Sequence, residues 1–168
     1  MRDFLFRRGF ILPVVVTAVV PTILLLATGH FSRVELESGV GGGAIGAAGV
    51  LLLISTTRLF ERHGGALAPW NPPRTMVVTG PYRYLRNPMI SGIFLMLLGE
   101  AVTFRSPWLG GWLAFFVTAQ LTYVAFEEEP KLRQRFGADY EHYCRQVPRW
   151  IPRLTPYRSV ERPPSSDA

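Results

Sequence analysis

Four apolar stretches, almost free of charged residues, dominate this chain of 168 residues and restrict what it can fold into. They run from about Phe10 to Thr28, Gly39 to Phe60, Met89 to Phe104 and Pro107 to Phe126. A helix needs about 20 residues to cross the hydrocarbon core of a bilayer, and only the third stretch is short for that. Because four isolated spans cannot close a β-barrel, we predict an all-α, polytopic integral membrane protein with about four transmembrane helices.

Lys and Arg residues are distributed unevenly among the connections. With four spans, the N-terminal arm, the central connection and the C-terminal tail share one side, and they hold 16 of the 18 Lys and Arg residues. Cytoplasmic loops are enriched in these residues, so both termini are expected in the cytoplasm, at the plasma or inner membrane if the chain is bacterial. The net charge of +6 is thereby explained by topology, and no nucleic-acid-binding motif accompanies it.

A cluster of glycines opens the second stretch, and it has two interpretations. The cluster has a spacing similar to that of a dinucleotide-binding loop, and its members are Gly39, Gly41, Gly42, Gly43, Gly46 and Gly49. That loop requires a preceding strand, whereas here an apolar run continues the cluster. Small residues four positions apart instead let two membrane helices approach closely. We therefore predict that the cluster packs helices together.

The central connection, Arg62 to Pro88, is longer than most links between helices, which have about 2–8 residues. It is rich in proline and aromatic residues, which predicts a structured cytoplasmic loop. Gly80-Pro81 predicts a turn, and Pro88 predicts the first turn of the third helix. The alternative is an interfacial loop whose arginines only orient the protein.

Three acidic residues, Glu127, Glu128 and Glu129, follow the fourth stretch at its cytoplasmic end. One interpretation is a solvated helix end paired with Lys131 or Arg133. The other is a site for a cation, because carboxylates near a membrane are costly unless they are paired.

Apolar residues continue beyond the acidic ones at steps of three or four among basic residues. They are Leu132, Phe136, Tyr140, Tyr143 and Val147. This pattern predicts a C-terminal interfacial helical segment that covers a pocket, divided in two at Gly137.

Other polar residues give weaker indications. Glu100, in the outer part of the third stretch, is predicted to have a structural role beside Arg105 or another polar neighbour. His63 and His142 are too isolated for a metal site, and none is expected. Cys144 is the single cysteine, and we interpret it as a packed or interfacial thiol.

Several motifs follow one another in the C-terminal half. They are Gly80-Pro-Tyr-Arg-Tyr-Leu-Arg-Asn-Pro-Met-Ile-Ser-Gly92, Glu128-Glu129, Leu132, Phe136-Gly137, Tyr140, Tyr143 and Val147-Pro-Arg-Trp-Ile-Pro152. In this order they resemble the isoprenylcysteine carboxyl methyltransferase family, with phospholipid N-methyltransferases as more distant relatives. The resemblance covers about Arg74 to Pro152, and the first two stretches carry no comparable signature.

The resemblance implies an enzyme that uses S-adenosyl-L-methionine. It also implies that this cofactor is enclosed by the central loop, the third and fourth helices and the C-terminal segment. The residues that it assigns to cofactor binding are Thr75, Met76, Val77, Tyr82, Arg86, Asn87, Pro88, Ile90, Glu128 and Glu129. A sulfonium cation suits carboxylates and aromatic faces, and the methionine carboxylate suits arginine. No single catalytic residue is implied, but Arg86, Asn87 and Glu129 are candidates for positioning the reactants.

The sequence departs from the family pattern in three places. Asn87 stands where the family has histidine, and Ile90 stands where it has tyrosine. Val124 occupies the place, one turn before the acidic pair, where eukaryotic members carry an arginine for the substrate carboxylate. Arg58 and Arg62 are alternative sources of that charge, so these two and Val124 are candidates for the substrate tunnel. The expected acceptor is a lipophilic small molecule or a lipidated, membrane-partitioned one.

We predict a single membrane domain over residues 1–168, with two spans in 1–60, a methyltransferase-like catalytic half in 61–152 and a disordered tail in 153–168. The expected function is S-adenosylmethionine-dependent methyl transfer at the cytoplasmic membrane face, among membrane lipids and without nucleic acid or metal. Two alternatives stay open. One is an NADPH-dependent membrane lipid or sterol-type reductase, which shares a similar arginine-histidine/asparagine-proline element, and the other is a non-enzymatic membrane protein.

Overall fold

The computed structural model describes residues 12–30, 34–62, 76 and 78–157, and for 60–62 only the backbone. Within these ranges every regular element is helical, as predicted. The elements are η1 (Val15–Val19), α2 (Val20–Thr28), α3 (Leu36–Arg62), η3 (Gly80–Arg83), α4 (Pro88–Phe104), α5 (Pro107–Tyr123), η4 (Val124–Glu128) and α6 (Glu129–Gln146). Of these, η1 and η4 are π-helical, and η3 is a 3-10 turn.

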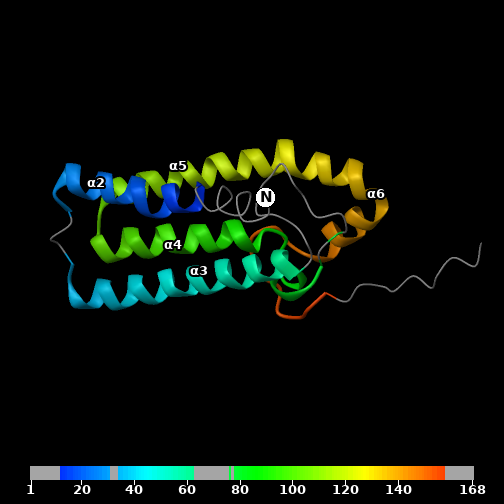
Figure 1. The fold of residues 1–168 in the computed structure, drawn as a ribbon, viewed down its shortest axis with the longest axis horizontal. Helices are drawn as coiled ribbons and strands as arrows, with labels where there is room; N and C mark the ends of the chain where they lie inside the picture. The colour runs from blue at the N-terminus through cyan, green and yellow to red at the C-terminus, as the bar shows by residue number, and fades with distance from the viewer. Residues whose placement is uncertain (1–11, 31–33, 63–75, 77, 158–168) are drawn as a thin grey trace, which may run out of the picture.

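The helices form an elongated bundle (Figure 1). α4 lies between α3 and α5, and η1 with α2 packs against α5. The helix of α5 continues through η4 into α6, which bends back at one end of the bundle. This end, called the α6 end below, also holds the connection before α4 and the segment after α6.

Among the described residues, two helical runs are long and apolar enough to cross a membrane. They are Leu36–Leu59, within α3, and the 40-residue run Pro107–Gln146, whose first part is α5. The apolar helices Leu12–Thr28 and Pro88–Phe104 are shorter, and α4 has 17 residues. Since a perpendicular crossing takes about 20 residues, these two need flanking residues to complete it. The count of four spans therefore stays a prediction.

Glycines bring α3 and α4 into direct backbone contact. A methyl group on Gly99 would lie 2.6 Å from Gly42 O and 2.6 Å from Gly46 N. Further along α3, a methyl group on Gly49 would lie 2.6 Å from Gly92 O in α4. The predicted packing role of the glycine cluster is thus confirmed, with Gly42 and Gly46 at the contact.

Two groups of buried apolar residues hold the bundle. The first joins η1, α4 and α5 through Val16, Ile93, Leu97 and Phe116. Trp112 packs against this group, and its Nε1 donates a 3.0 Å hydrogen bond to Val16 O. This bond gives a polar ring edge a partner inside an apolar layer.

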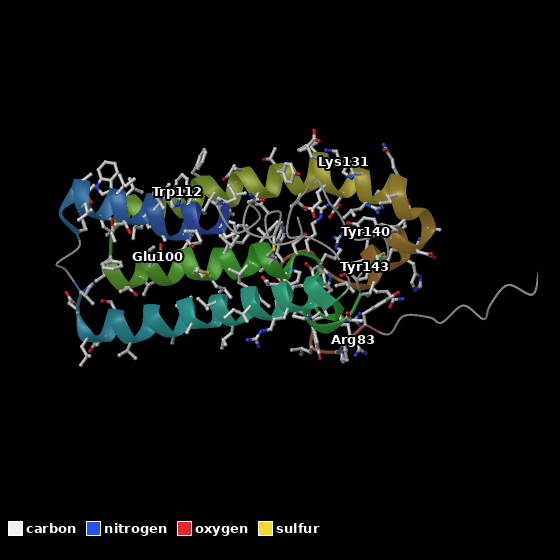
Figure 2. All side chains as sticks on the ribbon, in the orientation of Figure 1. Arg83, Glu100, Trp112, Lys131, Tyr140 and Tyr143 are labelled. Carbon is white, nitrogen blue, oxygen red and sulfur yellow. The ribbon has the colours of Figure 1, made fainter. Side chains whose placement is uncertain are left out.

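The second group lies at the α6 end and is called the tyrosine cluster. It contains Tyr140, Tyr143, Val147 and Tyr157, with Met76, Val78, Leu132, Phe136 and Cys144 packed around it. Figure 2 shows Tyr140 and Tyr143 at this end, far along the bundle from Glu100 and Trp112.

The bend in α6 directs its apolar face into the tyrosine cluster. Gly137 adopts φ 52° and ψ −130° inside the helix, which confirms the predicted division there. Only glycine adopts such a conformation without a steric penalty. The apolar face beyond the acidic residues is therefore packed against protein.

We predict that Gly99→Ala lowers the free energy of unfolding by about 1–3 kcal/mol, since backbone atoms of α3 block the added methyl group. Thermal unfolding in detergent measures the change. Gly43→Ala is the matched control, because a methyl group there meets nothing within 4 Å. Equal midpoints for the two variants would contradict the close packing of α3 and α4.

Candidate functional site

The connection before α4 is a short turn. Gly80 begins η3 with φ +58°, and Pro81 follows it, so the predicted Gly80-Pro81 turn is confirmed. Pro88 occupies the first turn of α4, also as predicted. The chain therefore enters α4 with a fixed geometry, and Arg86 and Asn87 lie directly before the helix.

Hydrogen bonds join this turn to the segment after α6, and we call the joined region the clasp. The backbone N–H of Arg86 donates to Pro148 O at 2.9 Å, and that of Arg153 donates to Tyr84 O at 3.0 Å. The Tyr143 hydroxyl adds a bond of 2.7 Å to Tyr82 O. Each bond connects residues about sixty positions apart, so the turn and the C-terminal segment are held as one unit.

Tyr157 extends the clasp into the segment predicted as a disordered tail. Its N–H donates to Arg83 O at 2.9 Å, and Arg83 Nε donates to its carbonyl at 2.7 Å. The ring is buried in the tyrosine cluster. The packed chain thus continues to Tyr157, and the predicted tail from 158 onward lies outside the described residues.

The three acidic residues have three different environments. Glu127 is exposed and accepts a 2.6 Å bond from Lys131, which lowers its pKa, as expected of a solvated helix end. Glu128 is half-buried, and Glu129 is 2% exposed. The interpretation as a solvated helix end is therefore confirmed for Glu127, and a cation site at the other two acidic residues stays a prediction.

Glu129 is bound by arginines from two other segments. Arg149 donates to both of its carboxylate oxygens at 2.6 Å, through Nε and Nη2. Arg86 Nη1 lies 2.9 Å from Oε1, and Arg133 is more distant at 3.9 Å. The two-point contact with Arg149 is the strongest geometry for such a pair. Both oxygens of Glu129 are therefore occupied by protein groups.

Cys144 belongs to the same group of side chains. Its Sγ lies 2.8 Å from Arg86 Nη1, and the residue is half-buried, consistent with a packed thiol. A cavity of about 280 Å³ opens beside it. Its lining residues are Arg86, Arg133, Glu141, Cys144, Arg145 and Arg149. Four guanidinium groups and one carboxylate line this cavity, so it favours an anionic group.

Glu128 and Tyr82 form the other polar part of the site. Burial and the neighbouring Glu129 carboxylate raise the pKa of Glu128, which lies beyond the apolar part of its helix. Burial and then the charge of Glu128 raise the pKa of Tyr82. The structure thus brings together Tyr82, Arg86, Glu128 and Glu129, four residues that the resemblance assigned to one site.

The other predicted site residues are spread more widely. Asn87, Pro88 and Ile90 stand at the start of α4, and Met76 packs on the tyrosine cluster. Thr75 and Val77 lie outside the described residues.

The candidate tunnel residues are not gathered by the described cavities. Val124 is 1% exposed in the core, and Arg58 is exposed on α3. Arg62 ends α3, and its side chain lies outside the described residues.

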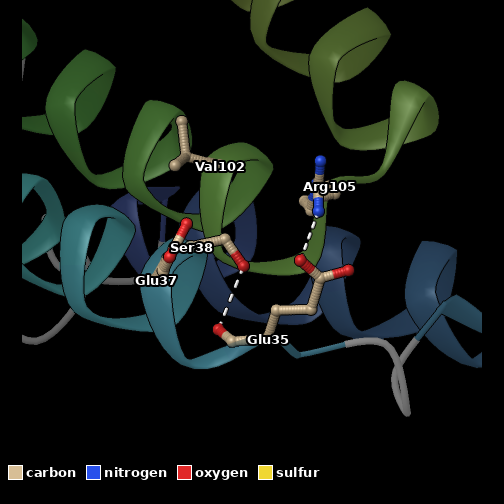
Figure 3. Close-up of a pocket in the computed structure, with 5 residues that line it drawn as sticks. All are labelled: Glu35, Glu37, Ser38, Val102 and Arg105. Carbon is tan, nitrogen blue, oxygen red and sulfur yellow. Dashed lines mark hydrogen bonds and ion pairs between the residues drawn. The ribbon is translucent and has the colours of Figure 1, made fainter.

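At the opposite end of the bundle, one predicted contact is wrong. Arg105, named as a partner for Glu100, instead forms an ion pair with Glu35 (Figure 3). Oε2 of Glu100 is buried, and no described residue offers it a hydrogen bond. Arg105 was close to Glu100 in sequence, but it lies in the turn after α4, where the start of α3 is nearer.

Arg149, which contacts Glu129 at both oxygens, is a residue that the sequence did not assign to the site. It was counted only as one of the orienting charges, although it lies within the Val147–Pro152 motif. Among the described residues, no three His, Cys, Asp or Glu side chains are grouped to hold a metal ion.

A family model described as phospholipid methyltransferase matches residues 38–139, more than half of the chain. The matched range contains the Gly80–Gly92 motif and all three acidic residues. Phospholipid methyltransferases belong to the isoprenylcysteine carboxyl methyltransferase-like group, so the resemblance is confirmed. Comparison with curated proteins and with solved structures gives no significant match.

We predict that Glu129→Gln lowers the free energy of unfolding by about 3–5 kcal/mol, since it leaves two arginines without their buried anion. Chemical denaturation in detergent measures the loss. Glu127→Gln, at an exposed pair, should leave the unfolding midpoint unchanged. If both variants unfold alike, the buried ion pairs are not what stabilises the α6 end.

Proposed function

Because this chain belongs to the phospholipid methyltransferase family of membrane methyltransferases, we propose that it methylates a lipophilic acceptor with S-adenosyl-L-methionine at the cytoplasmic membrane face. The family match carries the proposal. It spans α3 to the first half of α6, and so includes both the clasp turn and the acidic residues.

The residues at the α6 end suit this cofactor. S-adenosylmethionine supplies a methyl group bound to a positively charged sulfur. Glu128 offers a half-buried carboxylate beside Tyr82, which suits a sulfonium. The arginine-lined cavity suits the methionine carboxylate, with Arg133 and Arg145 less engaged by Glu129 than Arg86 and Arg149.

Arg86 and Glu129 act in this proposal as positioning residues. Because Glu129 already accepts bonds at both oxygens, its role is to hold Arg86 and Arg149 in place. Asn87 and Ile90 then face the reactants from the first turn of α4. Methyl transfer needs in-line approach at about 3 Å, so positioning and exclusion of water are the protein's main contributions. A carboxylate or thiolate acceptor needs no base, which fits a site with asparagine in place of histidine.

We propose that the acceptor is lipophilic or membrane-partitioned. Val124 provides no charge to hold a carboxylate, and it is packed in the core. Arg58 and Arg62, late in α3, are the candidates that would let a carboxylate acceptor bind instead. A membrane lipid fits the family, and the apolar helices would bring such an acceptor to the site.

We predict that the purified protein binds S-adenosylmethionine and S-adenosylhomocysteine, and that Glu128→Gln weakens binding of the former by about 10- to 100-fold. The loss should be smaller for S-adenosylhomocysteine, because it lacks the positive charge on sulfur. Calorimetry in detergent measures all affinities. Glu127→Gln is the matched control, since that carboxylate is exposed and paired with Lys131.

The same measurement separates the alternatives. Equal losses in the Glu127 and Glu128 variants would reduce the acidic residues to a helix end. Binding of NADPH in place of S-adenosylhomocysteine would favour a reductase. Binding of neither ligand by the folded protein would favour a non-enzymatic role.

The proposed orientation predicts an accessibility pattern. In a Cys144→Ser background, a cysteine at Glu37 should react with an impermeant reagent from outside the cell, and one at Thr79 only after permeabilisation. Both positions are exposed, so only the membrane limits the reaction. The reverse pattern would place the α6 end outside the cell and overturn the cytoplasmic assignment.

A further inference from the structure

Two large apolar side chains stand outward in the segment after α6. Ile151 is 78% exposed and Leu154 is 98% exposed. They lie three residues apart in a stretch, Pro148–Thr155, that forms no helix. Single exposed apolar residues are ordinary on protein surfaces, but a pair presented beside membrane helices suggests a partner.

The neighbouring Trp150 fixes the level of this stretch along the bundle. Its ring packs against the Phe94 ring in α4, with the ring planes tilted by 34° and the centroids 5.3 Å apart. Gly92, two residues before Phe94, packs against Gly49 and Leu53 of α3. Both α3 residues lie inside the span candidate Leu36–Leu59. The Trp150 ring therefore reaches the level of the membrane-spanning part of α3.

The backbone of the stretch cannot move away from this level easily. Pro148 and Arg153 are hydrogen-bonded to Arg86 and Tyr84, which directly precede α4. In Figure 1 the stretch lies at the α6 end of the bundle. Ile151 and Leu154 are thus held at the border between the spans and the α6 end.

Basic residues surround the two apolar ones. Arg153 lies between them in sequence, with its guanidinium on Gln146 O and Thr155 Oγ1. Arg149 precedes them and is still 39% exposed beyond its contact with Glu129. Aliphatic side chains that enter the acyl boundary, with arginines at the phosphates, are the usual composition of an interfacial anchor.

We propose that Pro148–Thr155 is a membrane anchor that inserts Ile151 and Leu154 into the headgroup–acyl boundary of the leaflet at the α6 end. The partner is the lipid surface itself. The apolar face of α6 cannot serve in its place, because Tyr140 and Tyr143 are buried in the tyrosine cluster. The anchor ties the clasp to a fixed depth in the bilayer, whatever reaction the site performs.

Fluorescence of single labels tests the anchor. An environment-sensitive dye is attached to Ile151→Cys, Leu154→Cys or Gln134→Cys in a Cys144→Ser background, in vesicles of phosphatidylcholine with and without phosphatidylglycerol. Dyes at 151 and 154 should emit at shorter wavelength and be quenched several-fold more by lipid-attached nitroxides than by iodide. The dye at Gln134, exposed on α6, should show the opposite preference.

A second measurement keeps Cys144 in place. A photo-crosslinking phenylalanine derivative replaces Leu154 in the otherwise unmodified chain, and mass spectrometry identifies its products. Lipid adducts at position 154, absent at position 134, support the anchor. Iodide quenching at 151 and 154 equal to that at 134, or crosslinks mainly to a second copy of the chain, would overturn it. Neither outcome depends on methyl transfer.

Discussion

The carboxylate of Glu129, bound by Arg86 and Arg149, is the interaction on which the α6 end depends. A buried carboxylate is strongly unfavourable unless cations and hydrogen bonds compensate for the lost water. Both arginines must therefore be held at that point. Arg86 stands just before α4, and Arg149 stands just after α6, so one charge draws together segments far apart in the chain. The hydrogen bonds of the clasp and the apolar packing of the tyrosine cluster hold the same end of the bundle together.

Local signals predicted much of this architecture. Glycine and proline act through their own backbone angles, so the turn at Gly80-Pro81, the start of α4 at Pro88 and the bend at Gly137 followed from single residues. The apolar stretches likewise predicted the helices that form the bundle. The sequence did not predict which glycines of the cluster make the contact. Their choice depends on the position of α4 as much as on α3.

The sequence did not predict the different environments of the three acidic residues. Glu127, Glu128 and Glu129 are identical in type and adjacent, yet one is solvated, one is half-buried and one is fully buried. The difference comes from long-range partners. Arg149 lies twenty positions later and looked like one more orienting charge, while the resemblance assigned both Glu128 and Glu129 to cofactor binding. Burial in the structure separates them, since Glu129 is bonded to the arginines and the charge of Glu128 raises the pKa of Tyr82.

The π-helical turn η4 sets how the acidic residues are aimed. Such a turn holds one residue more than the α-helical path it replaces. If the same residues followed an α-helical path instead, everything after them would be rotated by about 100°, the angle that one residue adds to an α-helix. Glu129 would then leave its arginines, while the membrane-facing part of α5 would be unaffected. The wider pitch of this one turn is therefore part of the site, because it decides which side of the helix the acidic residues after it occupy.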